Sequence, residues 1–201
     1  MFYDIEQNTP EWEILKLGKF SASPANDLMM KETNEGYKNL IKRIVEERIT
    51  GLPSESKWKG NKYTERGHEW EPIAREHFEL ETFTKVLNGG FFESDEYKGW
   101  ASCSPDGRIG NDGLIQIKNP IFSTQLDYLD DKKIPSNYIK QMQFELFITG
   151  REWNIFYSYH PSLPPINQKL YRDEKMISEI KTKLEIAIEQ VNNIINKIKA
   201  V

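Results

Sequence analysis

Cysteine is nearly absent from this chain, because Cys103 is the only one among 201 residues. A single thiol cannot form an internal disulfide, and it excludes a zinc or iron–sulfur site built from several cysteines of one chain. Histidine is also scarce, with three residues, and none of them forms the HExxH pair of zinc proteases. The shortage of cysteine predicts a protein of a reducing, cytoplasmic compartment.

Long apolar runs and an excess of one charge are missing as well. The mean hydropathy is −0.67, and no segment approaches the length of about 18 apolar residues that a membrane-spanning helix needs. We therefore expect no membrane partner. With 27 basic and 31 acidic residues, the net charge is −4. Bulk attraction to nucleic acid is not implied, so binding to DNA would require a local basic patch.

What is present predicts an α+β (α/β-like) fold in one domain. Hydrophobic residues make up 38% and aromatic residues 12% of the chain, enough for a core. Apolar periodicity and capping residues predict a central mixed β-sheet flanked by helices. Helices are predicted over 12–17, 37–49, 64–80, 122–131 and 136–149, from Ser23-Pro24 with Ser23 as N-cap, and from about Asp173 onward; strands are predicted over 83–87, 90–93, 100–104, 114–117, 153–159 and 168–172. A turn at 110–113 would join the strands over 100–104 and 114–117, and residues 54–62, with Lys57, Lys59 and Lys62, would form an exposed loop.

The pattern that points to chemistry lies at two predicted strands. Asp106, in the motif Ser104-Pro105-Asp106-Gly107, follows one strand, while Gln116 and Lys118 lie two apart on the next and so share a face. A carboxylate, an amide oxygen and a lysine together suit phosphodiester hydrolysis with Mg²⁺. The oxygens hold the metal, and the lysine orients water or stabilises an anionic transition state. An ordinary hairpin with a polar rim gives the same pattern by chance.

Two helices near this motif carry further polar residues. Glu71, on the helix before it, completes a metal site if it faces the sheet, and is a solvated glutamate if it does not. Tyr138, Gln141 and Gln143 lie on the helix after it. Gln143 is a candidate for binding a DNA phosphate or a metal-bound water, and the alternative is an exposed polar face.

In this order, the motifs resemble the phage lambda-exonuclease family, the phage-type recombination exonucleases of the PD-(D/E)xK nuclease superfamily. The resemblance runs from about Trp12 to Pro161, through the segments at 16–23, 67–72, 104–107, 116–118 and 138–143. It implies a restriction-endonuclease-like core and a single nuclease domain over residues 1–201. The long C-terminal helix is not diagnostic of the family.

By position, the resemblance implies roles for individual residues. Asp106, Gln116 and the carbonyl of Ile117 would hold Mg²⁺, for which Mn²⁺ can substitute, and Glu71 would serve a second metal or its waters. Lys118 would be the catalytic lysine. The residues implied in binding the 5′-phosphate and the DNA are Lys16, Ser21, Ser23, Ser104, Tyr138, Gln141 and Gln143. A helix opening at Ser23-Pro24 would also offer amide hydrogens to an anion, although plain helix capping explains these serines equally well.

The resemblance also implies an activity and partners. Members of this family degrade one strand of linear duplex DNA from its 5′ end, release mononucleotides, and leave a 3′ single strand for an annealing protein. Several are ring-shaped homotrimers threaded by DNA, which agrees with a net charge of −4 if the channel is locally basic. The implied compartment is the cytoplasm of a bacterium or of a phage-infected host.

Gln116 departs from the family pattern, which has an acidic residue at this position. Its amide oxygen can ligate a metal but brings no charge, and metal affinity falls with the charge of the ligands. Three explanations remain open: a natural enzyme that works with glutamine, a change made to trap a complex, or a protein that binds DNA ends without cutting them. The rival functions are accordingly a structure-specific endonuclease of the same superfamily and a non-cleaving DNA-end binding module.

Overall fold

The computed structural model describes residues 1–55 and 62–200, without the side chains of residues 62–68. Its elements follow in the order β1 (Phe2–Tyr3), α1 (Pro10–Lys16), β2 (Phe20–Ser21), α2 (Ala25–Leu28), α3 (Glu35–Thr50), α4 (Lys62–Thr82), β3 (Leu87–Asn88), β4 (Phe91–Glu93), β5 (Ala101–Cys103), β6 (Gly107–Ile109), β7 (Gly113–Lys118), α5 (Phe122–Asp131), α6 (Ser136–Thr149), β8 (Trp153–His160), β9 (Leu163–Tyr171) and α7 (Glu174–Lys199). Within these described ranges, no helix is both long and apolar enough to span a bilayer.

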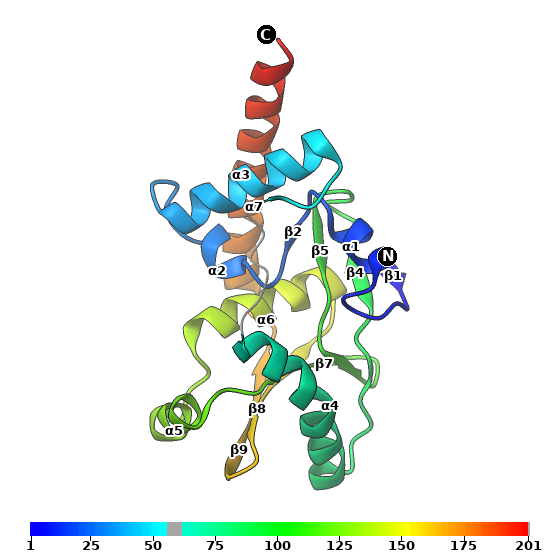
Figure 1. Cartoon of the computed structure of the whole chain (residues 1–201), viewed down its shortest axis with the longest axis vertical. Helices are drawn as coiled ribbons and strands as arrows, with labels where there is room; N and C mark the ends of the chain where they lie inside the picture. The colour runs from blue at the N-terminus through cyan, green and yellow to red at the C-terminus, as the bar shows by residue number, and fades with distance from the viewer. Residues whose placement is uncertain (56–61, 201) are drawn as a thin grey trace.

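The strands form two mixed sheets, where the sequence predicted one central sheet. A five-stranded sheet has the order β3-β6-β7-β8-β9, with β7 and β8 parallel and the other neighbours antiparallel. A four-stranded sheet has the order β1-β4-β5-β2, with β2 and β5 parallel. Helix α6 contacts β4 and β5 of one sheet and β8 of the other, so it links the two (Figure 1). The predicted α+β class, with mixed strand pairing and flanking helices, is confirmed.

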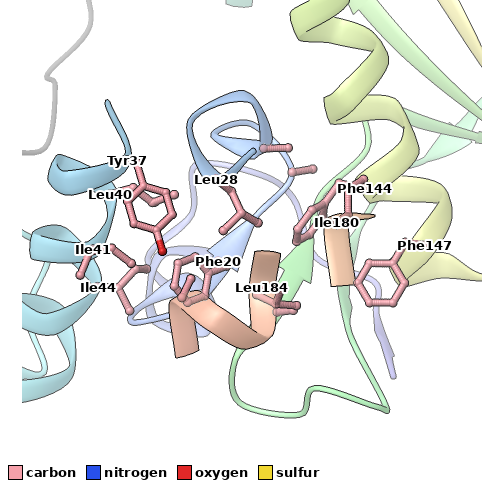
Figure 2. Packing of buried hydrophobic residues seen from close by; sticks show 14 of the residues in the cluster. Phe20, Leu28, Tyr37, Leu40, Ile41, Ile44, Phe144, Phe147, Ile180 and Leu184 are labelled. Atoms are coloured by element: carbon pink, nitrogen blue, oxygen red, sulfur yellow. The ribbon is translucent and has the colours of Figure 1, made fainter. Parts of the chain in front are cut away.

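Buried apolar faces hold the helices against both sheets. Around the four-stranded sheet, α2, α3, α6 and α7 share one cluster, in which Figure 2 shows Phe20, Leu28, Tyr37, Leu40, Ile41, Ile44, Phe144, Phe147, Ile180 and Leu184 in close packing. A second cluster packs Ala74 and Phe78 of α4 against Ile115 and Tyr157 of the five-stranded sheet. Each large apolar side chain buried in this way contributes about 1.5–3 kcal/mol. These two clusters fix α4 and α6 in place over the strands that carry the candidate site.

Several predicted boundaries agree with the structure. Helices α5 and α6 have the predicted bounds, and Gly150 ends α6 in the left-handed conformation, with a φ of 69°. Helix α7 begins after Asp173, whose carboxylate accepts the backbone N–H groups of Lys175 and Met176. Its buried residues are Ile177, Ile180, Leu184, Ala187 and Val191, and its last turns extend beyond the other elements in Figure 1.

Other boundaries were wrong. The predicted strand over 83–87 is replaced by a turn and irregular chain over 83–86, after α4 ends at Thr82, and by a two-residue strand, β3, that begins at Leu87. Phe83, with a φ of 53° and 96% of its surface exposed, follows the end of that helix. The turn at 110–113 joins β7 to β6 instead of β5, because a short strand begins directly after Asp106.

The expected N-cap at Ser23 is wrong, and most of the expected loop over 54–62 cannot be compared with the structure. Ser23 is not the N-cap of a helix: α2 has four residues, Pro24 stands at its cap position, and no side chain bonds to its first amides. Most of the predicted loop over 54–62, with Lys57 and Lys59, lies outside the described residues. Lys62 begins α4, and Ser54 is buried and donates a hydrogen bond to Glu46.

Candidate active site

A single cavity of about 740 Å³ collects most of the residues that the sequence singled out. Its walls come from both sheets and from α1, α4 and α6. The predicted residues that line it are Lys16, Ser21, Ser23, Glu71, Ser104, Asp106, Gln116, Ile117, Lys118, Tyr138 and Gln141. Segments that lie far apart in the chain therefore meet in one place, and only Gln143 of the predicted set is not part of the wall.

Asp106 is the centre of the polar network. It lies between β5 and β6, and its Oδ2 accepts the backbone N–H of Ile117 at 2.7 Å. Lys118, the last residue of β7, places its Nζ 3.8 Å from the same oxygen. Gln116 also donates to this oxygen through its Nε2. Gln116 and Lys118 thus lie on the same side of β7, as the alternation of a strand requires.

The amide of Gln116 is turned with its nitrogen toward Asp106. Its Oε1 instead accepts a hydrogen bond from Nε2 of Gln141 at 2.7 Å. An amide nitrogen has no lone pair to offer a cation, so ligation by Gln116 requires a half turn of its amide group. The structure therefore brings Gln116 to the predicted place but not in the predicted ligand orientation.

Glu71 reaches the pocket from α4. Burial and the neighbouring charge of Asp106 raise the pKa of Glu71 to about 7, against the opposing influence of Arg75 and Lys118. Arg75, one helical turn further, pairs with Glu71 at 3.3 Å and also donates to the backbone carbonyl of Asp106. Sequence reasoning missed Arg75, although its spacing of four residues from Glu71 predicts such a pair.

Glu145 is a second carboxylate that sequence reasoning missed. It lines the pocket from α6 and is fully buried. Burial and the charge of Asp106 raise its pKa to about 8, opposed by hydrogen bonds from Asn154 and Gln141 and by Lys118. Its position four residues after Gln141 places both side chains on one face of α6, which was the available indication.

The donor set suits a hard divalent cation. Asp106 and Glu71 offer carboxylates, and the carbonyl of Ile117 and the amide of Gln116 offer further oxygens, the ligand type that Mg²⁺ takes together with several waters. The charge of Asp106 raises the pKa of Glu71, which shows that the two carboxylates repel each other, and a bound cation removes that repulsion. No group of three or more His, Cys, Asp or Glu side chains suited to a metal occurs in the described part of the chain. Waters and neutral oxygens would therefore complete the coordination.

The pocket wall also carries hydroxyls and a second lysine. Trp12 of α1 donates its indole N–H to Oγ of Ser104 at 2.7 Å, and Nζ of Lys16 lies 4.2 Å from the ring centroid of Trp12. The hydroxyls of Ser21 and Ser102 are buried and lack a hydrogen-bond partner within the described residues. Because they line the cavity, they are available to an oxygen-rich group, and Ser102 adds to the predicted set.

Of the predicted residues on α6, Tyr138 lies at the pocket and Gln143 does not. Tyr138 lines the pocket, with Nζ of Lys118 5.3 Å from its ring centroid. Gln143 is buried elsewhere: its Nε2 donates to the carbonyl of Tyr171 at 2.8 Å, and its Oε1 accepts the N–H of Asp173 at 3.0 Å. Both polar ends of Gln143 are thus engaged where β9 joins α7, and the structure does not bring it to the site.

Comparisons with known proteins identify relatives of this chain and of its fold. Residues 11–152 match the model of the YqaJ-like viral recombinase domain, while no curated protein matches the chain. The structure is similar to that of an alkaline exonuclease (LHK-Exo) from Laribacter hongkongensis, with a TM-score of 0.88 and 32% identity over 96% of this chain and 97% of that one. The same values hold for LHK-Exo in complex with dAMP. A phage related exonuclease from Haemophilus somnus 129PT, 14% identical over 90% of this chain and 96% of that one, shares the fold with a TM-score of 0.69.

Proposed function

The chain belongs to the family of YqaJ-like viral recombinase domains, and from that membership we propose that it is a DNA exonuclease. In detail, it degrades one strand of linear double-stranded DNA from the 5′ end, with Mg²⁺ or Mn²⁺, and leaves 3′ single-stranded tails for recombination. The similarity to LHK-Exo, described as an alkaline exonuclease and solved with dAMP, supports a nuclease that handles nucleotides.

The observation that carries the proposal is the composition of the cavity. Asp106, Glu71 and Lys118 lie in the same pocket as Lys16 and the unpartnered hydroxyl of Ser21. An enzyme that removes nucleotides from a 5′ end has to bind a terminal phosphate and hydrolyse the next phosphodiester bond close by. A lysine and hydroxyls that share one cavity with two carboxylates and a second lysine meet both requirements.

The side chains divide the chemistry between them. Asp106 and Glu71, with the carbonyl of Ile117, would hold Mg²⁺, which when bound lowers the pKa of water and stabilises charge on the phosphate. Lys118, held 3.8 Å from Asp106, orients the attacking water or stabilises the anionic transition state. Lys16 attracts the terminal phosphate as a point charge, without the bidentate geometry of an arginine.

We extend the proposal to the partners that the family resemblance implies. Duplex DNA ends are the substrate, and the chain works as a homo-oligomer, a trimeric ring that encloses DNA. A single-strand annealing protein would take over the 3′ tail in the cytoplasm of a bacterium or an infected host. Size-exclusion chromatography with light scattering tests the trimer, because a monomeric mass at micromolar concentration contradicts it.

The test of the activity compares two DNA substrates. A 5′-phosphorylated linear duplex is incubated beside the same DNA as a closed circle, with Mg²⁺ and with EDTA. We expect loss of the linear DNA alone, in Mg²⁺ alone, and early release of a label placed on the 5′-terminal nucleotide. Release of a 3′-terminal label first would reverse the proposed direction. Nicking of the circle would favour the structure-specific endonuclease instead.

The orientation of Gln116 favours one second candidate, a module that binds DNA ends without cutting them. Its Nε2 faces Asp106 and its oxygen is bonded to Gln141, so the amide does not offer a ligand as it stands. If the wild-type protein binds ends but degrades neither substrate, the variant Gln116→Glu decides between the readings. Activity gained by this variant indicates a disabled nuclease, and continued binding without turnover indicates the binding module.

A further inference from the structure

Glu145 is the one carboxylate of the pocket that the proposed chemistry does not use. It is 0% exposed, and no basic side chain in the described ranges forms an ion pair with it. Its Oε1 accepts Nε2 of Gln141 at 3.1 Å, and its Oε2 accepts Nδ2 of Asn154 at 2.7 Å. Two neutral amides are thus its only hydrogen-bond donors there, which is a costly environment for an ionised carboxylate.

A continuous row of hydrogen bonds joins Glu145 to Asp106. Gln141 shares its Nε2 between Glu145 and Oε1 of Gln116, and Gln116 in turn donates to Asp106. Because Gln141 gives its nitrogen to Glu145, it presents that nitrogen to Gln116 as well, and this sets which end of the Gln116 amide faces Asp106. The carboxylate at position 145 therefore determines the orientation of two amides, that of Gln141 on the same helix and that of Gln116 on β7.

The charge of Glu145 also acts on the site directly. The charged and titratable groups that face it are Asp106, Lys118 on β7 and the buried Cys103 on β5. Repulsion from Asp106 is among the causes that raise the pKa of Glu145. A cation bound at Asp106 would reverse that effect, and by reciprocity an ionised Glu145 strengthens the binding of the cation.

We propose that Glu145 is a positioning residue of this site: it fixes the amides of Gln141 and Gln116, and it supplies to a divalent cation the negative charge that Gln116 lacks. The inference rests on the proposed metal-dependent function. It places a third carboxylate in the site, joined to position 116 through the amide of Gln141.

The first experiment measures Mg²⁺ affinity by isothermal titration calorimetry on the full chain at pH 9, where Glu145 is ionised. We expect Glu145→Gln to weaken binding by about tenfold, since it removes a charge from a poorly screened interior. Glu145→Asp keeps the charge and should stay within about threefold of the wild type. The matched control is Glu93→Gln, which removes another buried carboxylate that does not line the pocket, and should change the affinity by less than about twofold.

Repeating the measurement at low pH distinguishes an effect of the charge of Glu145 from an effect of its structural role. At pH 6, where Glu145 is protonated, the wild type and Glu145→Gln should bind Mg²⁺ equally, because Glu71 titrates in both. Equal affinities at pH 9 would overturn the inference while leaving the proposed function intact. Absence of Mg²⁺ binding by the wild type would instead count against the proposed function, and with it the role of Glu145 toward a cation.

A second experiment tests, in the absence of metal, whether a charge at position 116 is coupled to the charge at position 145. Melting temperatures are measured in EDTA for Gln116→Glu, Glu145→Gln and the double variant. Gln116→Glu places a carboxylate against Asp106 and against the shared nitrogen of Gln141, so it should lower the melting temperature more when Glu145 is present than in the Glu145→Gln background. Equal losses in both backgrounds would refute the coupling.

Discussion

The connection between α1 and β2 depends on Gly18, and we predict that Gly18→Ala lowers the free energy of unfolding by about 3–5 kcal/mol. Gly18 has a φ of 65°, a left-handed conformation that costs a residue with a Cβ about 1–2 kcal/mol. A Cβ at this position would also stand 2.7 Å from Cγ of Arg48. That atom lies near the root of the arginine side chain and cannot swing aside without moving the whole guanidinium group.

The rest of the expected loss comes from the contacts of Arg48. Its Nε donates to the carbonyl of Gly18 at 2.8 Å, and its guanidinium lies 3.2 Å from the ring centroid of Trp100. A charged hydrogen bond contributes about 1.5–3 kcal/mol, and a cation–π contact about 0.5–2 kcal/mol. Displacing Arg48 weakens both, which gives about 2 kcal/mol or more beyond the backbone strain.

Urea denaturation of Gly18→Ala, compared with Gly150→Ala, isolates the contribution of the Arg48 contacts to the free energy of unfolding. Gly150 has a φ of 69°, but a Cβ there meets nothing within 4 Å, so its substitution carries the backbone cost alone. We expect Gly18→Ala to lose at least about 2 kcal/mol more than the control. Equal losses would show that Arg48 adapts freely and that its contacts contribute little.

Three more predictions concern the site, and a fourth concerns Gln143 outside it. Asp106→Ala should reduce metal-dependent cleavage by about a thousandfold or more in a gel-based digestion assay, since it removes the central carboxylate. Near-normal turnover would contradict the assignment of Asp106 to the active site. Lys16→Ala should slow digestion of 5′-phosphorylated ends more than of 5′-hydroxyl ends, and equal losses would remove Lys16 from phosphate binding. Because the pKa of Glu71 is raised to about 7, protons compete with Mg²⁺ up to that pH; affinity measured by calorimetry should fall as the pH drops through 7, and Glu71→Gln should remove this step. Gln143→Ala should lower the free energy of unfolding by about 1–3 kcal/mol, because it removes the hydrogen bonds of Gln143 to the carbonyl of Tyr171 and to the N–H of Asp173, while cleavage per folded molecule stays as in the wild type; a loss of activity without a loss of stability would place Gln143 in the site.

Long periodic helices were the part of the fold that sequence reasoning predicted well. The bounds of α5 and α6 follow from apolar spacing, and the end of α6 follows from Gly150. Glycine adopts the left-handed conformation at a helix end at low cost because it lacks a Cβ. The strands were harder, because β2, β3 and β6 have two or three residues each. So few residues show no alternation, and β2 pairs with β5, which is distant in the chain, so the second sheet could not be foreseen.

The spacing on one strand placed Gln116 and Lys118 at the cavity, whereas on α6 the cavity-lining Glu145 was missed and Gln143 was wrongly included. Gln141 and Gln143 were treated alike, yet residues two apart on a helix point about 200° apart, and only Gln141 faces the pocket. Glu145, on the face of Gln141, was overlooked because it stands in an apolar stretch without a recognisable motif. Whether a carboxylate there is buried depends on the strands packed against it, which local sequence does not reveal.

The joining of Trp12 to Ser104 has a consequence for the order in which the molecule assembles. These residues lie 92 positions apart in the chain, and the pairing of β1 with β4 and of β2 with β5 spans similar separations. Closing such long loops costs entropy before any contact compensates for it, and folding slows as contacts become less local. Hairpins such as β6–β7 and β8–β9 can form early, while the part of the pocket wall that includes Lys16 and Ser21 is completed only when the N-terminal segment docks. During synthesis, the N-terminal strands would therefore pair only after β4 and β5 have left the ribosome, later than they themselves are made.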